Sequence, residues 1–272
     1  MDSLLNYSIV TGSSKGLGKS FAEELASRGN HLILVALPDE GLKQLSIELS
    51  EKYDVEVLFY ETDFSKQEAV YQFADWINSK YSINILVNNV GIGGTYSFLD
   101  SNAEYIDSII NINVRTFSLL TRLLLENLRQ RIHSYVLNVA SMASFSPMPY
   151  KTVYPASKAF IYSFSRSLSE ELKNTNIFVS VVHPGPMMTN ERVSKLIIKQ
   201  GRLGRFGLLP TDRIAEIAIN KLLRKKPLII PGILNKITWI AMKTMPVWFQ
   251  LYLGATLTQK ELDVSINEEK IA

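Results

Sequence analysis

The sequence predicts a doubly wound α/β fold, in which a mostly parallel sheet of about seven strands carries helices on both faces. Short apolar segments rich in β-branched residues alternate with helical patterns along most of the 272 residues, and this alternation is typical of parallel sheets. A glycine-rich turn joins the first strand to the first helix. Glycines and polar residues follow several later strands, whose carboxyl ends share one edge of such a sheet. We therefore expect one ligand crevice at that edge.

The composition excludes several classes of function. Hydrophobic residues make up 46% of the chain and charged residues 20%, which is typical of a globular protein. The net charge of +3 comes without a basic run, so no nucleic-acid partner is expected. The chain has no Cys and three His, none of them in a ligand-spaced pair, so we expect neither thiol chemistry nor a metal site.

Neither end of the sequence predicts insertion into a membrane. Residues 1–6 lack the basic segment of a signal peptide. The most apolar stretch, residues 244–259, holds sixteen uncharged residues interrupted by Pro246, Gln250 and Gly254, whereas a membrane-spanning helix needs about 20 apolar residues. We therefore predict a cytoplasmic protein without a transmembrane span, for which contact with a membrane surface stays open.

The first strand leads directly into the glycine-rich turn. Residues 5–11 contain the apolar strand, residues 12–18 the turn, and a helical pattern follows at once. This arrangement directs backbone N–H groups and a helix N-terminus at a pyrophosphate. Gly12 permits the tight turn, while Gly16 and Gly18 remove side chains where the ligand and the neighbouring strand come close. The segment predicts a nucleotide-binding loop, and the alternative is a merely flexible loop.

The later segments continue the alternation of strands and helices. Further strands are expected at residues 31–36, 55–60, 85–87, 135–139, 177–182 and 227–230. Helical patterns cover residues 66–80, 103–130, 154–173 and 212–223, and one more passes through Leu42, Leu45 and Leu49. Residues 187–206 are expected to cover the substrate.

Three side chains near the fifth strand predict acid–base chemistry. Ser141 follows the strand, and Tyr154 and Lys158 stand four residues apart near a helix start, which places them on one face. A phenol has a pKa of about 10 in water, and a nearby ammonium lowers it. With the Ser141 hydroxyl on the same substrate oxygen, the group becomes a proton donor and acceptor for a carbonyl or alcohol. The alternative is an exposed Tyr–Lys pair.

Two motifs together resemble the short-chain dehydrogenase/reductase family. These are the Thr-Gly-x-x-x-Gly-x-Gly pattern of residues 11–18 and Tyr154-x-x-x-Lys158, and the resemblance covers residues 5–230. It implies a Rossmann-type fold and an oxidoreductase that interconverts a ketone and a secondary alcohol by hydride transfer with nicotinamide. In this role Tyr154 moves the proton, Lys158 lowers the phenol pKa and holds the ribose, and Ser141 orients the substrate oxygen.

The resemblance also implies a water relay beside the lysine. In the family an asparagine disturbs the long helix before the catalytic segment, and the match here is Asn113, with Asn111 as the competitor. The alternative is a buried asparagine satisfied by the backbone.

NADP(H) is the favoured cofactor, and NAD(H) stays possible. Ala36 and Leu37 stand where an acid that selects NAD would bind the ribose, and Lys15 resembles the family's basic residue for the 2′-phosphate. The arginine often found at the position of Leu37 is absent. The residues implied in cofactor binding are Gly12, Ser14, Lys15, Gly16, Leu17, Gly18, Asp63, Phe64, Asn89, Tyr154, Lys158, Pro184, Gly185 and Thr189.

Two of these cofactor residues have structural alternatives. Asp63 follows the third strand, where the family contacts adenine, and it or Ser65 is also placed to cap the next helix. Asn89 lies in Asn88-Asn89-Val90-Gly91, which departs from the family's Asn-Asn-Ala-Gly only at Val90. Asn89 either bridges sheet and cofactor or only stabilises the sheet.

The chain is expected to divide into a Rossmann-type domain at 1–232, a helical extension at 233–262 packed on it, and a loose tail at 263–272. Two short apolar helices, 233–242 and 247–257, are predicted in the extension. They line an apolar pocket, pack against a partner, or lie on a membrane surface, and the first two interpretations are favoured.

The apolar extension favours a lipid-like substrate of the 3-oxoacyl, steroid or sphingoid type. The family often forms homodimers or homotetramers through two long helices, here 103–130 and 154–173. The rival hypotheses are an NAD-linked alcohol dehydrogenase of the same family and a dinucleotide-binding sensor without turnover.

Overall fold

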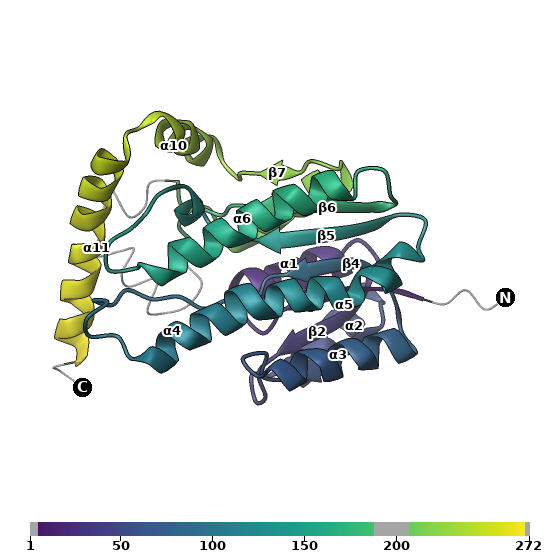
Figure 1. Cartoon of the computed structure of the whole chain (residues 1–272). Helices are drawn as coiled ribbons and strands as arrows, with labels where there is room; N and C mark the ends of the chain where they lie inside the picture. The colour runs from purple at the N-terminus through teal and green to yellow at the C-terminus, as the bar shows by residue number, and fades with distance from the viewer. Residues whose placement is uncertain (1–4, 188–206, 270–272) are drawn as a thin grey trace.

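A seven-stranded sheet forms the centre of the computed structural model, which describes residues 5–187 and 207–269 (Figure 1). The strand order is β3-β2-β1-β4-β5-β6-β7 and every neighbouring pair is parallel, which confirms the predicted doubly wound fold. Because the order reverses at β1 and β4, the carboxyl ends of these strands open a crevice there. The strands are β1 Asn6–Thr11, β2 His31–Ala36, β3 Val57–Glu61, β4 Ser82–Asn88, β5 Ser134–Val139, β6 Ile177–Val182 and β7 Leu228–Ile229.

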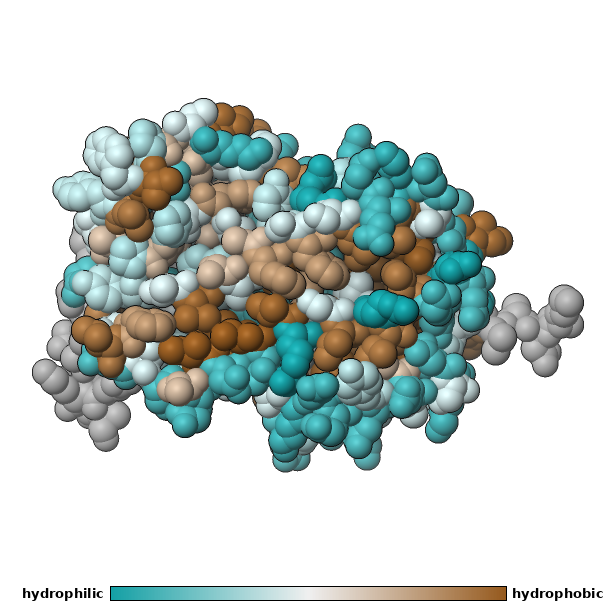
Figure 2. Space-filling view, viewed as in Figure 1, coloured by the Kyte–Doolittle hydropathy of each residue, from teal (hydrophilic) through white to brown (hydrophobic). Residues whose placement is uncertain are grey.

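Helices cover both faces of the sheet because successive strand residues point to opposite sides. Val10 belongs to the apolar cluster formed with α1, α2 and α9, whereas its neighbour Ile9 belongs to the cluster formed with α3 and α5. The helices are α1 Gly16–Ala26, α2 Leu42–Tyr53, α3 Gln67–Lys80, α4 Ala103–Ile110, α5 Phe117–Arg129, α6 Val153–Glu171, α9 Thr211–Leu223, α10 Ile233–Thr244 and α11 Val247–Glu269. Figure 2 shows apolar side chains reaching the surface along α4, α5 and α6.

The long predicted helix at 103–130 is interrupted. Between α4 and α5 the residues Asn111–Thr116 form a π-helix, η1, and such a bulge is frequent at functional sites. Asn113 lies within it and is fully buried. The predicted disturbance at this asparagine is therefore present in the backbone.

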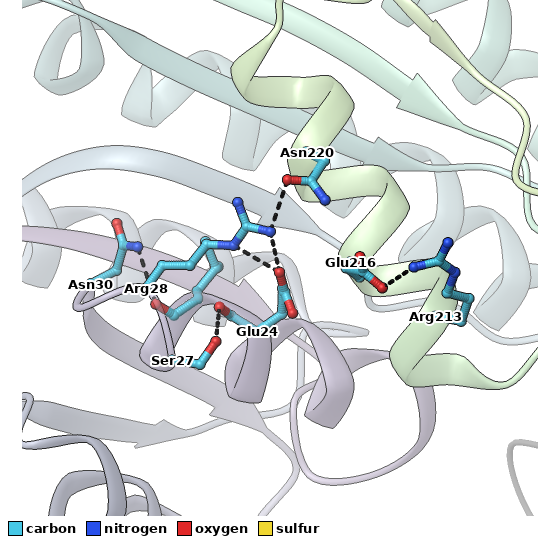
Figure 3. A network of polar contacts seen from close by, with 8 residues as sticks. Glu24, Ser27, Arg28, Asn30, Arg213, Glu216 and Asn220 are labelled. Carbon is cyan, nitrogen blue, oxygen red and sulfur yellow. Dashed lines mark hydrogen bonds and ion pairs between the residues drawn. The ribbon is translucent and has the colours of Figure 1, made fainter.

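Polar contacts fasten α1, the helix after the glycine-rich turn, to α9 (Figure 3). Arg28 donates from Nε to Glu24 Oε1 at 2.7 Å and from Nη2 to Asn220 Oδ1 of α9 at 3.0 Å. Nearer the start of α1, Ser20 Oγ donates to Thr211 Oγ1 at 2.8 Å. These bonds fix the direction of α1, and so of the turn that precedes it.

The C-terminal helices differ from the prediction in length. Pro246 separates α10 from α11, because proline ends one helix and is tolerated at the start of the next. The predicted helix 247–257 is too short, since α11 continues to Glu269 and so through most of the segment expected to be a loose tail. After Gly254 the sequence holds no glycine or proline to stop the helix. Among the described residues, no helix has the length and apolarity needed to cross a membrane.

Candidate active site

The glycine-rich turn has the shape that phosphate binding requires. Gly12 has a φ of +65°, in the left-handed region, and a Cβ on Gly18 would lie 1.9 Å from the Gly12 carbonyl oxygen, so α1 approaches the turn too closely for any side chain. Lys15 precedes α1 without capping it, and the first turn holds no acid. The backbone N–H groups at this helix start therefore fit a pyrophosphate.

Asn89 holds the glycine-rich turn against β4. Its Nδ2 donates to the carbonyl oxygens of Thr11 at 2.9 Å and Gly12 at 3.1 Å, while Thr11 Oγ1 accepts from the backbone N–H of Asn89 at 3.0 Å. The stabilising role left open by the sequence is therefore present, and contact with the cofactor stays a prediction.

Glu40 pairs with two polar residues of the turn, Ser14 and Lys15. Lys15 Nζ donates to Glu40 Oε1 at 2.7 Å, and the Ser14 hydroxyl donates to Oε2. These bonds, with Lys15 as the larger cause, lower the pKa of the Glu40 carboxyl. A search confined to the end of β2, at Ala36 and Leu37, misses this acid. The available signal is an acidic residue in the short loop before α2.

Asp63 and Phe64 occupy the carboxyl end of β3 in different ways. Asp63 Oδ1 accepts from the Ser65 N–H at 2.9 Å; burial alone would raise the pKa of this carboxyl, but the bonds with Ser65 outweigh it and lower the pKa. Neither Asp63 nor Ser65, the two residues considered as caps, caps α3, because the N-cap is Lys66 and makes no side-chain cap bond. The Phe64 side chain is buried against Phe73, so it belongs to the core, and contact of this segment with adenine stays a prediction.

Asn113 and Lys158 face the same small space beside Gly91. Asn113 Oδ1 accepts from Ile92 N–H at 2.9 Å, and its Nδ2 donates to Ile92 O at 2.8 Å and Ser157 Oγ at 2.9 Å. A Cβ on Gly91 would lie 3.1 Å from both Asn113 Oδ1 and Lys158 Nζ. The side-chain amide of Asn113 is thus hydrogen-bonded within the protein, as the structural alternative predicts. Asn113 also lies beside Lys158, where the water relay was predicted.

The competitor Asn111 lies elsewhere. Its Nδ2 donates to Asp107 Oδ2 at 2.6 Å in an exposed position. Only Asn113 of this pair is therefore brought to the lysine.

Ser141, Tyr154 and Lys158 meet at the carboxyl end of β5. Ser141 begins a short 3-10 helix, η2 Met142–Phe145, and its Oγ accepts from the Ala143 N–H at 3.1 Å. The Tyr154 phenol, one residue into α6, is hydrogen-bonded to Ser141. Lys158 Nζ donates to the Val139 carbonyl at 3.0 Å and lies 5.8 Å from the centre of the Tyr154 ring.

The electrostatics of this group correct the sequence-based expectation. Burial raises the pKa of the Tyr154 phenol, and its hydrogen bond with Ser141 only partly opposes the shift. Burial also lowers the pKa of the Lys158 ammonium to about 8. Lys158 does not contribute to this shift of the phenol pKa, and its ammonium donates to the Val139 carbonyl. At neutral pH the phenol is therefore a proton donor.

Gly93 is a site residue that motif matching does not reveal. A Cβ on Gly93 would lie 2.4 Å from Tyr154 Cδ2, so the phenol ring occupies its position only because this residue has no side chain. The available signal is the glycine-rich run after β4, at residues 91–94.

The loop after β6 joins the Ser141 segment to α10. His183 Nδ1 bonds to Ser141 O at 2.8 Å, and Pro184 O accepts from the Met142 N–H at 3.0 Å. A Cβ on Gly185 would lie 2.5 Å from Oδ1 of Asn235, a buried residue of α10. The part of Pro184 and Gly185 in cofactor binding stays a prediction.

Two further expectations concern Thr189, in the segment 188–206, and the absence of a metal site. Thr189 and the rest of 188–206 lie outside the described residues, so the structure says nothing of their part in the site. Within the described ranges, no three His, Asp or Glu side chains gather in a group that would hold a metal ion.

Residues 6–196 match the family described as short chain dehydrogenase, which is more than two thirds of the chain. The chain belongs to this family. Among its relatives, the very-long-chain 3-oxoacyl-CoA reductase of Anas platyrhynchos is 38% identical over 194 residues, which cover 70% of this chain and 62% of that protein. The chain thus spans about three fifths of the length of the curated relatives it matches.

Solved structures of short-chain dehydrogenases share the architecture. A 7beta-hydroxysteroid dehydrogenase superposes with a TM-score of 0.84 at 24% identity, covering 93% of this chain and 98% of its own. A short-chain dehydrogenase from Sphingobium yanoikuyae in complex with NADPH gives a TM-score of 0.77 at 25% identity, covering 88% of this chain and 92% of its own.

Proposed function

We propose that this short-chain dehydrogenase is an NADP(H)-dependent oxidoreductase that interconverts a ketone and a secondary alcohol. The observation that carries the proposal is the meeting of Ser141, Tyr154 and Lys158 at the edge of the sheet that also holds the glycine-rich turn. The cofactor residues fit, since the turn exposes uncapped N–H groups for the pyrophosphate.

In the proposed reduction, the bound dihydronicotinamide supplies a hydride to the substrate carbonyl carbon. Tyr154, kept neutral by its raised pKa, gives its phenolic proton to the carbonyl oxygen, and the Ser141 hydroxyl orients that oxygen by a hydrogen bond. Lys158, whose ammonium lies 5.8 Å from the centre of the Tyr154 ring, is proposed to hold the ribose. Asn113 supports return of the proton through water in the space beside Gly91.

A lipid-like substrate, including a 3-oxoacyl thioester, is the proposed class. A cavity of about 440 Å³ lies against the segment that follows Ser141, with Phe145, Met148 and Leu251 among its walls. Its walls are mainly apolar, as an acyl chain requires. The relatives named very-long-chain 3-oxoacyl-CoA reductase support the same class.

Oxidation of NADPH, followed by its absorbance, tests the function with a panel of lipid-like and small polar ketones. We expect turnover with the lipid-like ketones, and Tyr154→Phe to lower kcat about a thousandfold without changing the dissociation constant for NADPH. The matched control Tyr162→Phe, on the same helix, leaves kcat unchanged. NADPH binding without oxidation by any ketone supports the sensor instead, and near-normal turnover of Tyr154→Phe contradicts the catalytic assignment.

Glu40 favours a second candidate, an NAD-linked dehydrogenase. A carboxylate in the loop after β2 accepts hydrogen bonds from the adenosine ribose in NAD-specific enzymes, and Glu40 competes for the same Lys15 that the 2′-phosphate of NADPH would need. Under the favoured hypothesis, Glu40→Gln lowers the KM for NADPH about tenfold, the effect of one charge-assisted bond, and Lys15→Ala weakens NADPH more than NADH. A selective loss of NADH binding in Glu40→Gln supports the NAD-linked enzyme.

Homodimer formation through α4, α5 and α6 is also proposed. Apolar side chains reach the surface of these helices, including Ile110 of α4 and Phe160 of α6, and Phe160 stacks on Phe164 of the same helix. Such a face is typical of an interface between copies of a chain. Cytoplasmic location stays a prediction.

A further inference from the structure

Helix α11 has its polar and apolar faces reversed relative to an ordinary surface helix. Its buried residues Gln250, Gly254 and Thr258 recur every four positions and so lie on one face. Its exposed residues include Trp248, 71% exposed, and Tyr252, 66% exposed. Surface helices normally bury the apolar stripe and expose the polar one. The outward face of α11 is therefore apolar.

The inward face of α11 is held by polar and close backbone contacts. Gln250 Nε2 donates to the carbonyl oxygens of Met242 at 2.9 Å and Met245 at 2.8 Å, near the end of α10. Gly254 faces the loop before α6, where an added Cβ would lie in ordinary contact, 3.4 Å from Pro147 O. These contacts place polar and small residues of α11 on its inward face.

Helix α10 extends the same apolar surface. Ile233, Ile237 and Ile240 are all more than half exposed, and they recur at helical spacing on one face. Of the twenty-two large hydrophobic side chains exposed in the described part of the chain, eleven lie between residues 233 and 257. Figure 1 shows α11 standing across one end of the molecule with α10 beside it. We call the exposed apolar side chains of these two helices the C-terminal apolar surface.

Every charged residue from 217 to 259, the segment that contains the C-terminal apolar surface, is basic. Residues 217–259 contain no Asp or Glu. Lys236 and Lys243 lie on α10, and Lys243 Nζ stands 4.4 Å from the ring centre of Trp239. Lys221 of α9 is close enough to Lys236 that their repulsion adds to burial in lowering the pKa of Lys221. No carboxylate of this segment neutralises these cations.

We propose that the C-terminal apolar surface docks on an anionic lipid bilayer. Apolar and aromatic side chains beside unpaired lysines have the composition of helices that lie in the interface of a membrane with anionic lipids. A second copy of the chain fits less well, because a twofold interface through this face would bring the lysine-bearing α10 helices of the two copies together. The helices lie on the bilayer, since no described helix is long and apolar enough to cross it.

Cosedimentation of the full chain with vesicles tests the proposal. We expect the chain to bind phosphatidylcholine vesicles that contain phosphatidylserine at least about tenfold more tightly than vesicles of phosphatidylcholine alone, since each lysine near the surface adds to the attraction. Added salt reduces the difference. Binding that is absent, or equal for the two compositions, overturns the proposal.

Matched variants locate the contact. Ile237→Ser with Trp248→Ser is expected to lower binding about tenfold or more, as loss of two buried apolar side chains requires, and Lys236→Glu with Lys243→Glu to abolish the preference for phosphatidylserine. The controls are Ile132→Ser, an exposed isoleucine outside the surface, and Lys43→Glu on α2, both expected to bind as the parent does. If a double variant loses its circular dichroism spectrum, the single Trp248→Ser serves in its place.

Size-exclusion chromatography separates the rival occupant. A dimer that the Ile237 and Trp248 substitutions dissociate, in a chain that does not bind vesicles, shows that a second copy covers the surface and overturns the proposal. Equal losses of vesicle binding in the control and test variants overturn it as well.

Discussion

In α1 the buried face holds Leu17, Phe21 and Leu25, whereas in α11 it holds Gln250, Gly254 and Thr258. Both are α-helices, but the buried face of α1 is apolar and that of α11 is formed by polar and small residues. Removal of apolar surface from water drives α1 onto the sheet, where it fixes the glycine-rich turn. The inward face of α11 is instead held by the hydrogen bonds of Gln250, and the apolar side chains of this helix remain outside. A surface that a fold does not use for its own stability is available for a partner.

The largest expected difference between the two helices concerns their glycines. Gly18→Ala would place a Cβ 1.9 Å from Gly12 O, so we expect a loss of at least about 3 kcal/mol in the free energy of unfolding, as for severe backbone overlap, together with loss of NADPH binding. Gly254→Ala meets only ordinary contact at 3.4 Å and gains up to about 1 kcal/mol of helix propensity. Chemical denaturation measures both, and equal effects would break the comparison.

The next difference concerns the large aromatic residues. Phe21 is fully buried and Trp248 is 71% exposed. Phe21→Ala is expected to cost about 3–5 kcal/mol of the free energy of unfolding, whereas Trp248→Ala is expected to change it by less than about 0.5 kcal/mol. Urea unfolding without lipid checks the pair. A large loss in Trp248→Ala would mean that α11 contributes to the core after all.

The smallest effect is a pH dependence that comes from Lys158. Its pKa of about 8 in the folded chain lies below the ordinary 10.5, so between these values the unfolded chain binds more protons and stability rises with pH. From about pH 7 to about pH 9 this group adds about 1 kcal/mol to the free energy of unfolding. The rise should be missing in Lys158→Met when denaturation curves of the two proteins are compared at both pH values. Parallel pH dependences would show that the amine is not buried as described.

The sequence predicts the scaffold of this protein better than the electrostatics of its site. Strand β6 begins and ends where the apolar run does, at Ile177 and Val182, because a strand buried on both faces has an apolar residue at nearly every position. Asn113 also lies where the motif places it, since a helix bulge is a local property. The side-chain partners depend on tertiary structure.

Three features of the structure show why side-chain partners and pKa shifts could not be predicted from the sequence. The pairing of Lys15 with Glu40 depends on the path of the loop after β2. The direction of the pKa shift of Tyr154 depends on burial, which here exceeds any effect of the nearby lysine. The outward apolar side chains of α11 depend on which face Gln250 anchors. Periodicity reports that a helix is amphipathic, but not which of its faces the rest of the chain will meet.

Asn235 of α10 fixes the position of this helix relative to the loop after β6. Its Nδ2 donates to Gly207 O and Pro231 O, both at 2.9 Å, and its oxygen fills the space where Gly185 would carry a side chain. A tilt of α10 would therefore break these hydrogen bonds or bring Asn235 into steric overlap with Gly185. A displacement of α10, on the outside of the molecule, would therefore be transmitted to the turn beside Ser141.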